Sequence, residues 1–92
     1  MDVVNAEGAV SGPQYRVSGQ LLNTADLPVS WISVVVTLYD AEARVVGYRQ
    51  RTWGEEVTLA VGQTLDFQVL LTPQTLDAPS DFQVIAWAVL QG

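Results

Sequence analysis

The stretch Ile-Ser-Val-Val-Val-Thr-Leu-Tyr-Asp at residues 32–40, followed by Arg-Val-Val-Gly-Tyr at residues 44–48, decides the fold of this chain. Both segments are rich in β-branched and aromatic residues, which favour strands. The run Asp40–Ala43 between them suits a chain reversal, because an aspartate side chain can bond the backbone two residues further on. The pattern therefore predicts a long β-hairpin, with Trp31–Asp40 paired to Arg44–Trp53.

Strand signals recur along the rest of the chain, with turn residues between them. Apolar and polar residues alternate, and no window combines helical spacing with a cap. The further expected strands are Val3–Glu7, Gln14–Asn23, Glu55–Ala60, Thr64–Thr72 and Phe82–Leu90. With the hairpin they make about seven strands, which predicts an all-β domain, an antiparallel sandwich of the immunoglobulin or fibronectin type. A small closed barrel is the alternative.

The length favours one domain over residues 1–92, with an edge strand and loop at residues 1–13. A chain of this size buries roughly 60–65% of its unfolded surface, and 49% of its residues are apolar, which is enough for a two-layer core. A deep ligand cavity of several hundred Å³ is not expected beside such a core.

The charge balance excludes several classes of partner. The net charge is −6, and the only basic side chains are four arginines. Nucleic acid and anionic membrane surfaces both require a basic patch, so neither is expected as a partner. No segment approaches the roughly 20 apolar residues of a membrane helix. Arg44, Arg49 and Arg51 fall in one predicted strand, where they indicate a charged edge that discourages aggregation rather than an anion-binding stripe.

The residue inventory predicts no enzyme and no cofactor. Histidine, cysteine and lysine are all absent, so Ser–His and Ser–Lys nucleophile pairs, disulfides, and tight zinc or haem sites cannot form. Only carboxylates remain to act as acid and base: Asp40 and Glu42 lie two residues apart in one predicted turn, and Glu55 and Glu56 are adjacent. A glycosidase needs two carboxyl groups across a substrate cleft, and a domain this small offers no sign of one.

Calcium is the more serious chemical alternative, because it takes oxygen ligands. Acidic residues fall in three predicted loops, which could converge at one end of a sandwich: Asp26, Asp40, Glu42, Asp77 and Asp81. No ligand-dense run of the EF-hand kind occurs, so these residues are expected to start turns and solvate loops.

Two predicted strands are apolar on both faces. The faces opposite the expected core carry Trp31, Val35 and Tyr39 on one strand and Ile85, Trp87 and Val89 on the other. Exposed together they would form a contact surface, for which Trp and Tyr are favoured anchors. We therefore expect homodimerisation or docking to a neighbouring domain, unless another part of the chain covers them. Alternatively, Trp53 could serve as a stacking platform for carbohydrate.

Four motifs, in order, are similar to those of the FxLYD family of bacterial and archaeal domains: Arg16–Asn23, Val34–Asp40, Arg44–Gly47 and Val61–Phe67. Val36 stands where the family has phenylalanine, and Ala43 where glycine is common. The resemblance implies a sandwich attached to cell-surface, lipoprotein or secreted proteins, and no catalytic residues. The expected function is a non-enzymatic interaction or spacer module outside the cytoplasm, with a carbohydrate- or calcium-binding module as the alternative.

Overall fold

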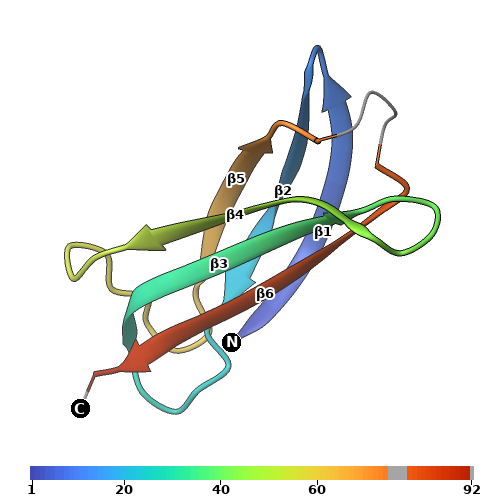
Figure 1. Ribbon diagram of the computed structural model, residues 1–92. Helices are drawn as coiled ribbons and strands as arrows, with labels where there is room; N and C mark the ends of the chain where they lie inside the picture. Colours follow the sequence, from blue (N-terminus) through green and yellow to red (C-terminus); the bar gives the residue numbers. More distant parts are fainter. Residues whose placement is uncertain (75–78, 92) are drawn as a thin grey trace.

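The computed structural model describes residues 1–74 and 79–91, which are arranged as strands and connecting turns without a helix (Figure 1). The strands are β1 (Asp2–Ser11), β2 (Gln14–Leu22), β3 (Val29–Tyr39), β4 (Val45–Trp53), β5 (Thr64–Leu71) and β6 (Asp81–Leu90). They form two antiparallel sheets of three strands, ordered β1–β2–β5 and β4–β3–β6. The prediction of an all-β structure is confirmed. No described helix is long and apolar enough to cross a membrane.

The two sheets pack on one shared apolar core. In Figure 1 the β4–β3–β6 sheet lies in front of the β1–β2–β5 sheet, and the strands of the two layers cross. The predicted inward residues of β3 are Ile32, Val34, Val36 and Leu38, and each is 0% exposed. The opposite sheet adds Val17, Leu21, Phe67, Val69 and Leu71 to the same core. Period-two alternation therefore places the core residues correctly, because successive side chains of a strand point to opposite faces.

The prediction of a further strand at Glu55–Ala60 is wrong. Beyond Trp53 the chain turns, and the Val57 N–H donates to the Gly54 carbonyl. Only Leu59 makes a sheet-like bridge, to Val29 at the start of β3. The segment carries strand-forming residues, but it crosses from the β4–β3–β6 sheet to the β1–β2–β5 sheet and has no neighbouring strand to pair with along its length.

Asn23 closes this end of the sandwich. Its side chain is 2% exposed, and its Nδ2 donates to the carbonyls of Leu27 and Leu59 at 3.0 and 3.1 Å. Its Oδ1 accepts from the Ala25 N–H at 2.9 Å. Asn23, just after β2, therefore connects the β2–β3 turn to the crossing segment Glu55–Ala60. Its buried amide is stable because all its polar atoms are paired.

β1 is longer than the predicted strand Val3–Glu7. It continues to Ser11, and the loop expected from Gly8 onward is confined to a tight turn at Gly12, where φ is 59°. Gly8 belongs to the strand, where it pairs with Val17, and the Tyr15 ring occupies the place of a side chain at position 8. A bulge also interrupts the pairing near Asn5, where φ is 55°.

The hairpin turn between β3 and β4 is organised by Asp40, as predicted. Its Oδ1 accepts the N–H groups of Glu42 and Arg44 at 2.9 Å, and its Oδ2 pairs with Arg44 Nε at 2.8 Å. The Arg44 N–H, with the Glu42 N–H and the guanidinium, lowers the pKa of the Asp40 carboxyl below its ordinary value. Ala43 adopts φ 62°, a left-handed conformation that normally favours glycine.

Candidate functional site on the outer face of the β4–β3–β6 sheet

The strand register brings five of the six predicted contact residues onto the outer face of one sheet. Val35 of β3 lies opposite Ile85 of β6, and Ser33 lies opposite Trp87. Tyr39 lies further along the same face of β3, and Val89 lies two residues beyond Trp87. Alternate residues share a face, so these side chains form one surface. Trp31, the sixth residue, lies on the same strand at a register shift between Ser30 and Ser33. We call all six residues together the apolar face: Trp31, Val35, Tyr39, Ile85, Trp87 and Val89.

Four side chains of the apolar face are about half exposed. The exposed fractions are 49% for Trp31, 50% for Ile85, 46% for Trp87 and 52% for Val89. Val35 and Tyr39 are half-buried, and the Tyr39 hydroxyl donates to Gln83 Oε1 at 3.0 Å. The alternative in which another part of the chain covers this surface is therefore wrong for the four exposed residues within the described structure.

Trp31 occupies a β-bulge. The pairing of β3 with β6 shifts between Ser30 and Ser33, and Trp31 has φ 52°. A bulky residue with positive φ is uncommon and costs conformational energy. Ser33 beside it is 5% exposed, and its hydroxyl pairs with that of Thr52 at 3.0 Å. Alternation alone could not reveal this bulge, because the extra residue depends on pairing with β6.

Tyr48 is a residue of this face that sequence reasoning missed. It lies on β4 opposite Thr37 and is 74% exposed. Its position follows from the hairpin register, since Thr37 shares the outer face of β3 with Val35. Aligning the two strands of the predicted hairpin could therefore have placed Tyr48 on this face, although the composition of β4 is that of a charged strand.

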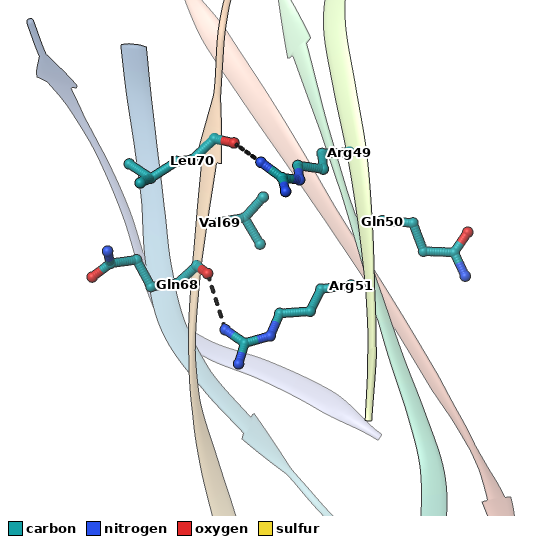
Figure 2. A pocket seen from close by; sticks show the side chains of 6 residues that line it. All are labelled: Arg49, Gln50, Arg51, Gln68, Val69 and Leu70. Atoms are coloured by element: carbon teal, nitrogen blue, oxygen red, sulfur yellow. Dashed lines mark hydrogen bonds between the residues drawn. The ribbon is translucent and has the colours of Figure 1, made fainter. Parts of the chain in front are cut away.

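The arginines of β4 are positioned at the side of the sandwich rather than on the apolar face. Figure 2 shows Arg49 and Arg51 reaching from β4 to β5 across a groove of about 340 Å³. Their Nη1 groups donate to the carbonyls of Leu70 and Gln68, at 3.0 and 3.3 Å respectively. Arg44, predicted in the same cluster, instead pairs with Asp40 and Glu42 in the turn. The arrangement favours a guarded strand edge over an anion site.

Trp53 lies apart from the apolar face, at the end of β4. It is half-buried against the core, and the Arg51 guanidinium carbon lies 4.6 Å from its ring centroid. This is the geometry of a cation–π contact. One face of the ring is therefore already covered, which leaves less of it for stacking against a sugar.

The acidic loops do not converge as the calcium alternative requires. Asp26 precedes β3 and Asp40 follows it, so they lie at opposite ends of a strand of 11 residues, roughly 35 Å long at 3.3 Å per residue. Asp81 lies nearer to Asp40, because it pairs with Tyr39, and its Oδ1 accepts the N–H of Phe82. Asp77 lies outside the described residues. Among residues 1–74 and 79–91 no group of three acidic side chains is placed to hold a metal ion.

These features distinguish one surface of the molecule, the apolar face, from its charged sides and loops. The chain was also compared with models of known protein families, with curated proteins and with solved structures, and nothing in any of the three matches it significantly.

Proposed function

We propose that this domain is a non-enzymatic protein-interaction module that contacts another protein, or a neighbouring domain, through the apolar face. The observation that carries the proposal is the clustering of two tryptophans, an isoleucine and a valine, each about half exposed, on one sheet. Contiguous exposed apolar surface marks contact sites, and tryptophan contributes strongly to binding energy because it excludes much water on contact.

The backbone at Trp31 supports this function. Left-handed conformations of bulky residues cost about 1–3 kcal/mol and persist where the surrounding structure imposes them. Here the bulge at Trp31 leaves half of an indole ring in water, which benefits the folded monomer little. A partner that covered Trp31 would bury the exposed half of its indole ring, which is a gain that the folded monomer lacks.

The inventory of side chains supports a role without catalysis. Neither an imidazole, a thiol nor an amine side chain is present to act as base or nucleophile. The carboxylate of Asp40, which lines a hollow with Ser80 and Asp81, is already bonded by two backbone N–H groups and by Arg44. A carboxylate held in this way orders a turn.

The finer assignment, an FxLYD-type sandwich of immunoglobulin or fibronectin class outside the cytoplasm, is part of the same proposal. It is supported by structural positions for several motif residues. Gly19 lies where a Cβ would meet the Ala6 Cα at 3.0 Å, Phe67 is buried in the core, and Gly62 has φ 80°. Modules of this kind space or join domains of longer surface proteins.

A photo-crosslinking amino acid at two matched positions tests the proposal. One variant carries it at Trp87 on the apolar face, and the control carries it at Gln68 on the outer face of the other sheet. In extracts of the source cells, we expect protein adducts at position 87, either to a second copy or to another protein, and several-fold fewer at position 68. Equal yields at the two positions would refute the proposal.

A further inference from the structure

The sandwich has four open strand edges, and three of them carry features that discourage pairing with another strand. These edges are β1, β5 and β4. On β5, the carbonyls of Gln68 and Leu70 accept bonds from the β4 arginines, which also place charge along β4. On β1, the bulge at Asn5 breaks the regular ladder. Charges, bulges and covered peptide groups are the usual protections of an exposed edge.

The fourth edge, β6, lacks these features along Phe82–Leu90, although β1 of the other sheet lies beside it. Between Phe82 and Leu90 the sequence contains no charged residue and no proline. β6 pairs with β3 alone among the described strands, and Figure 1 shows it at the lower border of the front sheet. Half of the peptide groups of an antiparallel strand point away from its partner, so β6 offers a regular row of donors and acceptors to a further strand.

We propose that β6 pairs antiparallel with β6 of a second copy of this chain, about a two-fold axis through Ala86. The proposal rests on the proposed function and names a partner for the part of the apolar face that lies on β6, namely Ile85, Trp87 and Val89. A two-fold interface uses the same patch from both copies. The two β4–β3–β6 sheets would then form one continuous sheet, and the two apolar faces would lie on the same side of it.

The register centred on Ala86 is self-complementary. It sets Ile85 against Trp87 of the second copy, and Gln83 against Val89, each pair occurring twice. Aromatic residues opposite aliphatic β-branched residues are favourable cross-strand pairs. Asp81, the only charged residue of β6, falls opposite the neutral Gln91 of the second copy. No like charges therefore meet along the new ladder, although each copy has a net charge of −6.

The available area indicates a reversible dimer. A fully buried tryptophan buries about 150–250 Å² of surface, so the half-exposed Trp87 can bury roughly 100 Å² more on dimerisation, and Ile85 and Val89 somewhat less. The total for both copies falls below the roughly 1,200 Å² of stable complexes. We therefore expect monomers in dilute solution and dimers at high concentration. Added salt should strengthen the dimer, because it screens the repulsion between two acidic copies.

Sedimentation over a dilution series tests the pairing with two charge variants. Ile85→Lys places a charge in the centre of the proposed ladder, and Gln50→Lys places the same charge at an exposed position of the far strand β4, opposite Val35. Each adds one positive charge to an acidic chain, so general electrostatics cannot explain a difference between them. We expect Ile85→Lys to weaken self-association at least tenfold and Gln50→Lys by less than twofold. Equal effects would overturn the proposal.

Disulfide trapping tests the register, since the native chain has no cysteine. Gln83→Cys and Val89→Cys should form a cross-linked dimer several-fold faster when mixed than either forms alone, because only the mixture places two thiols opposite each other. A protein that stays monomeric at every concentration, or faster cross-linking of either variant alone, would refute the pairing. If position 87 then still yields adducts to another protein, only the self-pairing fails; if it yields none, the proposed function fails as well.

Discussion

The two outer faces of the sandwich follow the same strand geometry but carry opposite chemistry. On the β1–β2–β5 sheet, a chain of side-chain hydrogen bonds crosses all three strands, from Asn5 to Gln20 at 3.1 Å and from Gln20 to Asp66 at 3.0 Å. On the β4–β3–β6 sheet, the corresponding positions of β3 and β6 carry Val35, Ile85 and Trp87. Antiparallel sheets commonly have one solvated polar face, and only the first sheet follows that rule.

This difference shows which residues serve the fold of the monomer and which do not. On the polar face, the side chains of Asn5, Gln20 and Asp66 bond to one another. The apolar face leaves Ile85 and Trp87 about half in water, although the core beneath is already complete with residues such as Leu38 at 0% exposure. The proposed contact with another surface would account for this composition.

The largest expected effect compares the two sides of the β4–β3–β6 sheet. Leu38→Ala empties a fully buried site and should lower the free energy of unfolding by about 2–5 kcal/mol. Ile85→Thr, on the apolar face, should change it by less than about 1 kcal/mol. Urea denaturation of dilute protein measures both. A cost for Ile85→Thr equal to that of Leu38→Ala would show that the apolar face is needed by the monomer.

The turns of the two sheets provide the next comparison. Gly12 in the β1–β2 turn and Ala43 in the β3–β4 turn both have left-handed φ, at 59° and 62°. Ala43→Gly should stabilise the protein by about 0.5–1 kcal/mol, and Gly12→Ala should destabilise it by about 1 kcal/mol. A Cβ at position 12 meets no atom within 4 Å, so the effect there is purely conformational. Thermal unfolding of both variants would show effects of opposite sign; effects of the same sign would contradict this account.

A smaller effect is expected on the polar face. Gln20→Ala removes both hydrogen bonds of the side-chain chain and should cost about 0.5–1.5 kcal/mol, with no change in self-association. Gln68→Ala is the control, because it lies on the same face and engages Arg51 only through its backbone carbonyl. A change in the sedimentation of Gln20→Ala would show instead that the contact surface lies on the β1–β2–β5 sheet.

The smallest effect concerns pH at the hairpin of the apolar sheet. The pKa of Asp40 is lowered in the folded state, chiefly by the Arg44 N–H, so its carboxylate stabilises the fold above the unfolded pKa of about 3.9 and loses this effect as the pH falls through the folded pKa. Asp40→Asn keeps a side-chain oxygen that can accept the backbone N–H bonds, but it removes the charge. The stability difference between the two proteins should be full at neutral pH, begin to fall near the unfolded pKa of about 3.9, and vanish only below the lower pKa of the folded state. A difference that grew in acid would contradict this sign.

The sequence alone predicts the alternation within each strand and much of the candidate site. Ile32 and Val34 on one face, and Val35 on the other, are placed correctly because the period of two is a property of a single strand. The apolar face was predicted for the same reason, since Ile85 and Trp87 cannot both serve a core that takes Val84 and Ala86 from the same strand.

Beyond the predicted hairpin, only the tertiary structure decided which segments pair and where pairing stops. Glu55–Ala60 has the composition of a strand but no neighbour, Trp31 is displaced by a bulge that exists only opposite β6, and Arg49 finds its acceptor on a strand of the other sheet. Alternation is a local consequence of backbone geometry, whereas hydrogen-bond partners and exposed edges arise between segments distant in the chain. For that reason the residues of this chain indicate which side chains face outward, and only the assembled sheets reveal that β6 is an open edge of its sheet.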